Sequence, residues 1–229
     1  MSRRALVTGG MRGIGAEVVA RLTADGMDVV TLDVLPGATY EVDLADPAPL
    51  PDVGAVDVLV SCAAITTTIA PAHRMTDEQW RRDLDVNLTG AYRVVRACLP
   101  GMRERRHGRI VAIASLAAVQ GLPGQVAYAA SKAGLLGMVK TVAAENVAHG
   151  ITANVVLPGL VETEMVQAMP AEVRERLTAL LPSGRMSQSD EVAALVAFLA
   201  RDEAGAITGQ DIAVAGGADL NTTSLTRSG

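Results

Sequence analysis

The sequence predicts an α/β protein: one doubly wound parallel sheet of seven strands with helices on both faces. Short, β-branched apolar runs alternate along the chain with longer helical stretches, a pattern typical of parallel strands joined by crossover helices. Most of these runs are continuously apolar, as expected for strands that are buried on both faces. The chain has 229 residues, so we expect a single domain over residues 1–229 that ends in a polar tail at 221–229.

The individual elements follow from these runs in chain order. The expected strands are Ala5–Thr8, Val29–Asp33, Thr39–Val42, Asp57–Ser61, Arg109–Ser115, Thr152–Leu157 and Ile212–Val214. The expected helices are Gly13–Asp25, Asp77–Arg106, Val126–Ala148, Ala171–Leu181 and Ser189–Ala200, the last with Ser189 as its N-cap residue. Residues 46–54 contain three prolines, so this crossover should be a shortened loop without a helix.

Composition and charge exclude several classes of protein. The chain carries 20 basic and 25 acidic residues, and only 2% of its residues are aromatic, which argues against nucleic-acid binding. Cys62 and Cys98 form no Cys-x-x-Cys pair and lie in apolar runs, so we expect buried thiols and no metal site. Residues 110–131 are uncharged but are interrupted by Gly, Pro and Gln, so no membrane span is expected. The first ten residues do not resemble a signal peptide, and we expect a cytoplasmic protein.

A glycine-rich turn joins the first expected strand to the first expected helix. Residues 6–15 read Leu-Val-Thr-Gly-Gly-Met-Arg-Gly-Ile-Gly. Gly9 lets the chain turn, Gly13 lets the backbone approach a pyrophosphate, and Gly15 lets the helix lie close to the strand. The helix N-terminus then supplies N–H donors and the positive end of its dipole. This arrangement predicts a dinucleotide site in a Rossmann-like fold.

The residue that ends the second strand indicates which dinucleotide binds. Asp33 follows Gly13 at the spacing of about 20 residues that is expected of the acid that binds the adenosine ribose. A carboxylate there repels a 2′-phosphate, and residues 34–36 offer no cation to hold one. Arg12 is the competing feature, because its guanidinium could reach a 2′-phosphate. Since an uncompensated carboxylate beside a phosphate is costly, we expect NAD(H) as the cofactor rather than NADP(H).

A phenol and an ammonium lie one helical turn apart in the second half of the chain. Tyr128 and Lys132 share one face of the expected helix, and Ser115 ends the fifth expected strand. A free phenol has a pKa of about 10, which a nearby ammonium and a cationic nicotinamide would bring toward neutrality. By itself this spacing is typical of surface pairs. Combined with Ser115 and the glycine-rich turn, it predicts an acid–base catalytic site.

Together these residues resemble the short-chain dehydrogenase/reductase family. The resemblance covers about residues 4–220 and rests on motifs in family order: Thr-Gly-x-x-x-Gly-x-Gly at 8–15, Asn87, Ser115, Tyr128-x-x-x-Lys132, and Pro158-Gly159 with Thr163. It implies reversible hydride transfer between a nicotinamide cofactor and a carbinol or carbonyl carbon. Similar proteins are commonly homotetramers that pair through the long helices and the last strand, so we expect a homotetramer, with a dimer as the alternative.

The resemblance also implies a role for each site residue. Tyr128 would be the general acid/base, Ser115 would hold the substrate oxygen, and Lys132 would bind the nicotinamide ribose and lower the pKa of Tyr128. Asn87 would hold the water that links Lys132 to solvent. Cofactor contacts, besides Tyr128 and Lys132, would come from Gly9, Arg12, Gly13, Ile14, Gly15, Asp33, Asp43 (at the adenine ring), Leu44, Ala63, Pro158, Gly159, Val161 and Thr163.

Two segments depart from the family pattern. Ser61-Cys62-Ala63-Ala64 stands where the family usually has Asn-Asn-Ala-Gly, so amide hydrogen bonds between neighbouring strands should be lost. Ala64 should also restrict the backbone near the cofactor. The second departure is the Pro-rich crossover at 46–54, which bears on the adenine contact of Asp43. We expect an altered cofactor wall with the chemistry retained.

These observations leave the substrate open. The main hypothesis is hydride transfer between NAD(H) and a moderately apolar secondary alcohol, diol or ketone. It rests on an expected lid at about 160–186, lined by Met165, Met169, Leu177 and Leu180. The alternative is an NADPH-dependent 3-oxoacyl-thioester reductase. The chain resembles 3-oxoacyl-acyl-carrier-protein reductases at 106–110 and 184–217, and an acidic carrier would need the basic patch of Arg103, Arg105, Arg106 and Arg109. A non-catalytic cofactor sensor is disfavoured, because Asn87, Ser115, Tyr128 and Lys132 are all present.

Overall fold

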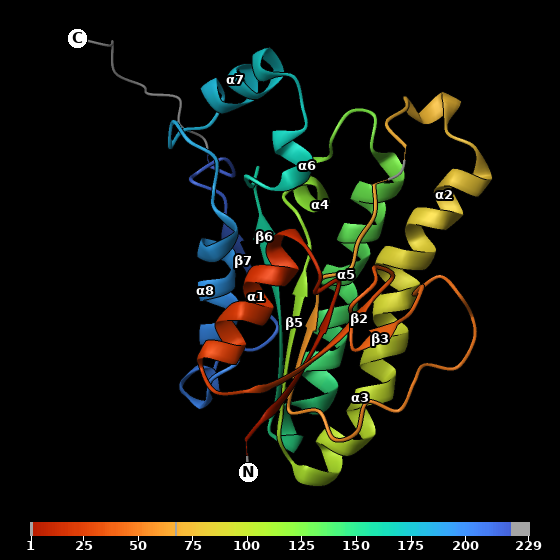
Figure 1. Ribbon diagram of the computed structural model, residues 1–229, viewed down its shortest axis with the longest axis vertical. Coiled ribbons are helices and arrows are strands. Elements are labelled where there is room, and N and C mark those ends of the chain that lie inside the picture. Colours follow the sequence, from red (N-terminus) through yellow and green to blue (C-terminus); the bar gives the residue numbers. More distant parts are fainter. Residues whose placement is uncertain (1, 67, 221–229) are drawn as a thin grey trace.

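A seven-stranded parallel sheet forms the centre of the molecule in the computed structural model (Figure 1), as the sequence predicts. The structure describes residues 2–66 and 68–220, with the backbone alone for Met165. The strand order is β3-β2-β1-β4-β5-β6-β7. The strands are β1 (Arg4–Thr8), β2 (Asp28–Asp33), β3 (Tyr40–Glu41), β4 (Val58–Ser61), β5 (Gly108–Ile113), β6 (Ile151–Pro158) and β7 (Asp211–Val214). The sheet reverses its winding between β1 and β4, where doubly wound proteins bind ligands at the carboxyl ends of the strands.

Helices cover both faces of this sheet (Figure 1). The α-helices are α1 (Gly13–Ala24), α2 (Asp77–Leu84), α3 (Ala91–Arg105), α4 (Ala117–Gln120), α5 (Val126–Asn146), α6 (Glu164–Gln167), α7 (Ala171–Ala179) and α8 (Ser189–Leu199). α1 and α8 pack together on one face, while α3 and α5 lie on the other. Among the described residues, no helix is long and apolar enough to cross a membrane. The expected polar tail at 221–229 lies outside the described residues.

Two hydrophobic clusters fill the space between the sheet and its helices. Along β1, Ala5 and Val7 contribute to the cluster under α1 and α8, whereas Leu6 contributes to the cluster under α3 and α5. This division follows from the alternation of side chains along a strand. Because both faces are covered, all three side chains are fully buried, which explains why the strands read as continuous apolar runs.

The expected helix Asp77–Arg106 is wrong as a single regular element. The structure divides it into α2, a π-helical turn η2 (Asp85–Gly90) and α3. Single π turns inside α-helices occur frequently at functional sites. The N-cap of α8 is a smaller correction: the cap is Gln188, whose N–H donates to Glu191 Oε2 at 2.7 Å, and Ser189 is the first helical residue.

The Pro-rich crossover is a loop without a helix, as predicted from its prolines. The preceding strand β3 is only two residues long, shorter than the expected Thr39–Val42. Arg93 of α3 donates to the carbonyl oxygens of Leu44, Asp46 and Ala48. A single side chain therefore satisfies three loop carbonyls that a crossover helix would otherwise have satisfied internally.

Candidate active site

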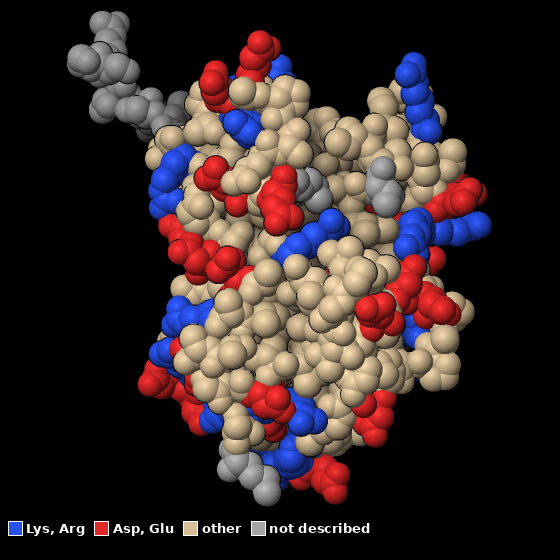
Figure 2. Space-filling model, viewed as in Figure 1, with Lys and Arg blue, Asp and Glu red and all other residues tan. Residues whose placement is uncertain are grey.

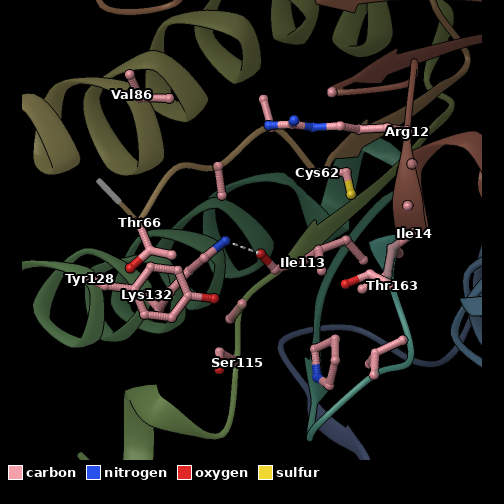
Figure 3. A pocket seen from close by; sticks show the side chains of 18 of the residues that line it. Arg12, Ile14, Cys62, Thr66, Val86, Ile113, Ser115, Tyr128, Lys132 and Thr163 are labelled. Atoms are coloured by element: carbon pink, nitrogen blue, oxygen red, sulfur yellow. Dashed lines mark hydrogen bonds between the residues drawn. The ribbon is translucent and has the colours of Figure 1, made fainter. Parts of the chain in front are cut away.

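A pocket of about 660 Å³ lies beyond the carboxyl ends of the strands, within the size range of small-molecule and cofactor sites. All of the predicted site residues line it except Asn87. They come from the turn after β1, from the ends of β2 and β3, and from the segments after β4, β5 and β6. Figure 3 shows Arg12 crossing one side of the pocket, with Tyr128, Lys132 and Ser115 on the other.

The glycine-rich turn forms a cradle that side chains would obstruct. A Cβ on Gly9 would lie 2.6 Å from Ala63 Cα, and one on Gly15 would lie 1.9 Å from the Gly9 carbonyl oxygen. Gly13 has a φ of 54°, which favours glycine. The N-cap residue of α1 is Arg12, and its side chain makes no capping hydrogen bond. The first N–H groups of α1 therefore fit the pyrophosphate of a dinucleotide.

Asp33 is held in place at the end of β2 and is only 8% exposed. Its Oδ2 accepts from the N–H of Met11 and its Oδ1 from the N–H of Leu35, both at 3.0 Å. A carboxylate can accept about four hydrogen bonds, so acceptor capacity remains for two ribose hydroxyls. Arg12 is exposed and forms no ion pair with any residue that the structure describes.

The phenol and the ammonium lie together, as the helical spacing predicts. Lys132 Nζ lies 5.7 Å from the centre of the Tyr128 ring and donates to the carbonyl oxygen of Ile113 at 2.7 Å (Figure 3). Ser115 lies two residues beyond β5 and is hydrogen bonded to Tyr128. Ser115 Oγ accepts from the N–H of Ala117 at 3.1 Å. Because that bond uses a lone pair, the Ser115 proton is left for Tyr128 or for a ligand oxygen.

Burial shifts the pKa values of Tyr128 and Lys132 in the directions that disfavour their charged forms. Burial raises the pKa of Tyr128 above its usual 10, and the hydrogen bond with Ser115 opposes the shift. Burial also lowers the pKa of Lys132 from 10.5 to about 8. In the protein without a cofactor, the pKa of Tyr128 is therefore raised and not lowered, because desolvation outweighs the hydrogen bond with Ser115. The expected effect of a cationic nicotinamide on this pKa stays a prediction. Tyr128 is accordingly a protonated phenol at neutral pH, which suits a proton donor.

Asn87 lies behind the pocket wall and not in it. The residue is 1% exposed and sits in the π turn. Its Nδ2 donates to the Ile65 carbonyl oxygen at 2.9 Å and to Ser131 Oγ at 3.1 Å, and its Oδ1 accepts from the Ile65 N–H at 2.8 Å. Asn87 thus ties the segment after β4 to α5, the helix that carries Tyr128 and Lys132.

The unusual segment at 61–64 is held by a side chain from β1. Thr8 Oγ1 accepts from the N–H groups of Cys62 at 3.1 Å and Ala63 at 3.2 Å, so a hydroxyl links the two strand ends that amide side chains were expected to link. Ala64 needs no glycine-like backbone, because its φ is not positive. Burial raises the pKa of the Cys62 thiol, which lines the pocket, to about 11. Cys98 is buried, as expected, and neither cysteine is in a disulfide.

The turn after β6 forms the wall opposite the glycine-rich turn. Pro158, Gly159, Val161 and Thr163 line the pocket, and Thr163 lies against Gly13. The expected apolar lid is only partly correct. α6 and α7 lie beyond this turn (Figure 1), but the buried apolar residue of α6 that lines the pocket is Val166.

Of the four residues named for the lid, the three whose side chains the structure describes do not line the pocket. Met169 and Leu177 are half-buried elsewhere, Leu180 is 74% exposed, and the side chain of Met165 lies outside the described residues. Leu180 follows the C-terminus of α7, which ends at Ala179, two residues before the expected Leu181. Among the side chains that the structure describes, no methionine lines the pocket.

Sequence reasoning missed four polar pocket residues, one of which is Glu164 at the start of α6. Thr66 points into the site beside Tyr128 (Figure 3), and its buried Oγ1 has no hydrogen-bond partner among the described residues. Gln125 lies just before α5. Arg82 reaches the pocket from α2, one helical turn before Val86. The i, i+4 spacing of Arg82 and Val86 could have indicated a shared face, but no motif marked it.

Comparisons with known proteins agree with this geometry. Acetoacetyl-CoA reductase of Shinella zoogloeoides is 42% identical over 238 residues, covering 95% of this chain and 98% of the relative. The 3-oxoacyl-[acyl-carrier-protein] reductase FabG of Escherichia coli (strain K12) is 39% identical, covering 93% of this chain and 96% of the relative. A family model described as enoyl-(acyl carrier protein) reductase matches residues 50–219.

A crystal structure of an oxidoreductase of the short-chain dehydrogenase/reductase family from Burkholderia thailandensis superposes with a TM-score of 0.86. Its sequence is 39% identical, and the match covers 95% of this chain and 93% of that one. The chain belongs to the short-chain dehydrogenase/reductase family. As a member of this family, it is an oxidoreductase that acts on CH–OH or oxo groups with a nicotinamide cofactor.

Proposed function

We propose that this short-chain dehydrogenase/reductase reduces a 3-oxoacyl thioester to the 3-hydroxyacyl thioester, with NADH as the hydride donor. The observation that carries the proposal is similarity over nearly the whole chain to two kinds of reductase whose names specify this substrate group. It favours the thioester over the simple apolar alcohol or ketone that the expected methionine-rich lid had suggested. The site agrees, since its catalytic end presents a protonated phenol and a hydroxyl toward the pocket.

Two side chains handle the oxygen of the substrate. When bound, a nicotinamide ring supplies a hydride to the C3 carbonyl carbon. Ser115 donates a hydrogen bond to the carbonyl oxygen and thereby polarises the bond. Tyr128 transfers its phenolic proton to the same oxygen as negative charge develops there, giving the hydroxyl group. Because burial keeps the Tyr128 phenol protonated at neutral pH, the free enzyme is poised for reduction.

Lys132 and Asn87 support this proton transfer. The ammonium of Lys132 stabilises the phenolate that remains on Tyr128 and binds the nicotinamide ribose. Asn87 keeps α5 fixed relative to the segment after β4 through its bonds to Ile65 and Ser131. The Ser131 hydroxyl in turn donates to the Tyr128 carbonyl oxygen at 2.7 Å. The backbone that carries the phenol is therefore anchored to Asn87 through the Ser131 hydroxyl.

The choice of NADH follows from Asp33. Its carboxylate is fixed by two backbone N–H groups, so it cannot swing away from a 2′-phosphate. Arg12 is the cation that could offset this repulsion, but it is exposed and its charge is screened by solvent. We therefore assign NAD(H) to the chain and treat NADP(H) as the weaker cofactor.

The structure favours a coenzyme A thioester over a thioester on an acidic carrier protein. The basic patch expected at Arg103, Arg105, Arg106 and Arg109 is weaker than the sequence implies. Arg109 is 6% exposed and pairs with Asp202, and Arg105 pairs with Asp57. The remaining two lie at the amino end of β5, opposite to the end that leads to Ser115. On the face shown in Figure 2, acidic and basic side chains are interspersed.

A substrate panel tests the proposal. Acetoacetyl-CoA, the matching carrier-protein thioester, and secondary alcohols and ketones without a thioester are each assayed with both cofactors. We expect the highest kcat/KM for acetoacetyl-CoA with NADH, and no turnover by Tyr128→Phe under the same conditions. A ketone without a thioester that matches acetoacetyl-CoA in kcat/KM would refute the substrate assignment. A higher kcat/KM with NADPH would refute the cofactor assignment alone.

A further inference from the structure

A hydroxyl without a partner lies at the catalytic end of the pocket. Thr66 follows the last residue of β4 by five positions and lines the pocket, and Figure 3 shows its side chain beside Tyr128. Its Oγ1 is buried and makes no hydrogen bond to any residue that the structure describes. Most buried polar side-chain atoms have a hydrogen-bond partner, because leaving one unpaired costs stability. At the wall of a pocket, such an atom indicates a contact with a ligand.

The backbone on both sides of Thr66 is anchored, so the place of this hydroxyl is defined before a ligand binds. Ile65 exchanges two hydrogen bonds with the Asn87 side chain, at 2.8 and 2.9 Å. Farther along, the N–H of Ala70 donates to the carbonyl oxygen of Gly124 at 2.8 Å, just before α5. Both anchors connect the segment after β4 to α5, the helix that carries the catalytic phenol. Thr66 is therefore presented at a set position relative to that phenol.

Thr66 supplies a donor that is not engaged elsewhere, next to groups that are. Ser115 and Tyr128 are hydrogen bonded to each other, and Lys132 donates to a backbone carbonyl oxygen. Rotation about the Cα–Cβ bond of a threonine exchanges the positions of its hydroxyl and its methyl group. The Thr66 hydroxyl can therefore turn toward a ligand without breaking a hydrogen bond to any described residue.

The substrate class of the proposed function carries an acceptor for this donor. A 3-oxoacyl thioester has two carbonyl oxygens, on C1 and C3, and one methylene group separates the two carbonyl carbons. Ser115 and Tyr128 hold the C3 oxygen during reduction, so the C1 oxygen must lie close to them as well. We propose that Thr66 determines substrate specificity: its hydroxyl donates to the C1 carbonyl oxygen and thereby selects 1,3-dicarbonyl compounds over simple ketones. This inference rests on the proposed function.

Two small ketones separate this contact from recognition of coenzyme A. Ethyl acetoacetate keeps both carbonyl groups but lacks coenzyme A, whereas 2-heptanone has a chain of the same length with a single carbonyl group. Steady-state kinetics of the full chain with NADH give kcat and KM for acetoacetyl-CoA and for both ketones. Each compound is compared between the unmodified protein and a variant, so the greater intrinsic reactivity of a 1,3-dicarbonyl compound cancels.

Matched variants at two threonines of the same segment carry the test. Thr66→Val removes the hydroxyl and keeps the shape of the side chain. It should lower kcat/KM for both dicarbonyl compounds by about three- to tenfold, through a higher KM, and should change that for 2-heptanone less than about twofold. Thr66→Ser keeps the hydroxyl and should retain the selectivity of the unmodified protein. Thr68→Val makes the same change at a side chain that does not line the pocket, and should alter none of these values.

Three results would overturn the inference. The first is an equal loss for all three compounds in Thr66→Val, which would mean that Thr66 only maintains the structure of the site. The second is no loss for either dicarbonyl compound, which would mean that another donor, such as the Gln125 amide, holds the C1 oxygen. The third is reduction of neither dicarbonyl compound by the unmodified protein, which would overturn the proposed function as well. If the proposed function alone fails, acetoacetyl-CoA is not reduced, while Thr66→Val still weakens the reduction of ethyl acetoacetate and not that of 2-heptanone.

Discussion

Replacing Lys132 with methionine should stabilise the protein while it abolishes turnover. Lys132 is 2% exposed, and burial lowers its pKa from 10.5 to about 8. At about 1.4 kcal/mol for each unit of pKa, keeping this ammonium charged in the folded protein costs about 3 kcal/mol. Methionine keeps a similar apolar stem but removes the donor to the Ile113 carbonyl oxygen, a loss of about 1 to 2 kcal/mol. The net gain should be about 1 to 2 kcal/mol.

The pH dependence of this gain distinguishes desolvation from improved packing. Below pH 8 the ammonium is protonated in both the folded and the unfolded state, so the unmodified protein bears the whole cost. Between about pH 8 and 10.5 the folded protein releases this proton while the unfolded chain retains it. The free energy of unfolding of the unmodified protein therefore rises with pH relative to Lys132→Met. The stability advantage of Lys132→Met should be largest at pH 7, should vanish between about pH 9 and pH 10, and should reverse by pH 10.5, where only the loss of the hydrogen bond to Ile113 remains.

Urea unfolding of both proteins without cofactor, at several values between pH 7 and pH 10.5, measures this difference. In thermal unfolding at pH 7, the melting temperature of Lys132→Met should be higher by about 2 to 8 °C for a chain of this size. A variant that is less stable than the unmodified protein at pH 7 would refute the reasoning. A stability difference that does not change with pH would also refute it, because packing alone would then explain the gain.

Three further predictions concern the site and the core. In Tyr128→Phe, kcat should fall by a factor of about 10² to 10⁴ because the proton donor is lost. The NADH dissociation constant of this variant, measured by calorimetry, should change less than about twofold. Weaker NADH binding would argue for a structural role of Tyr128. The kcat/KM for NADH, which reports on the free enzyme, should fall as pH rises through about 8, because Lys132 loses its charge there; a profile that stays flat to pH 10 would contradict this. Leu6→Ala should lower the free energy of unfolding by about 2 to 5 kcal/mol in urea titrations, since Leu6 is fully buried. Val34→Ala is the control: this side chain is 65% exposed, so the free energy of unfolding should change little.

The features that the sequence predicted well depend on local pattern. Continuous apolar runs mark strands covered on both faces, and the turn at 9–15 is marked by glycines that each serve a backbone requirement. The pairing of Tyr128 with Lys132 needed only the helical repeat. The family, the fold class and the class of enzyme are confirmed by the comparisons. The individual roles of the site residues stay predictions.

The features that it missed depend on partners far along the chain. From the sequence Arg109 was interpreted as a surface cation, but it is the second residue of β5 and pairs with Asp202, far along the chain. Arg82 belongs to no motif, and its ion pair with Asp43 depends on the fold that brings the two residues together. The interruption of the long helix at Asn87 likewise reflects hydrogen bonds to Ile65 and Ser131. No local pattern of residues encodes such contacts.

The π turn at 85–90 changes the direction in which the side chains of the long helical segment point. Each extra residue in a helix rotates everything beyond it by about 100°, so the segments on the two sides of the turn present different faces. Before and within the turn, Arg82 and Val86 face the pocket; after it, Val94 and Cys98 face the sheet. One stretch of chain thereby lines the pocket and packs against the sheet, which an unbroken amphipathic helix could not do with a single face. Any substitution that regularises this turn should misalign the pocket wall and the core at the same time.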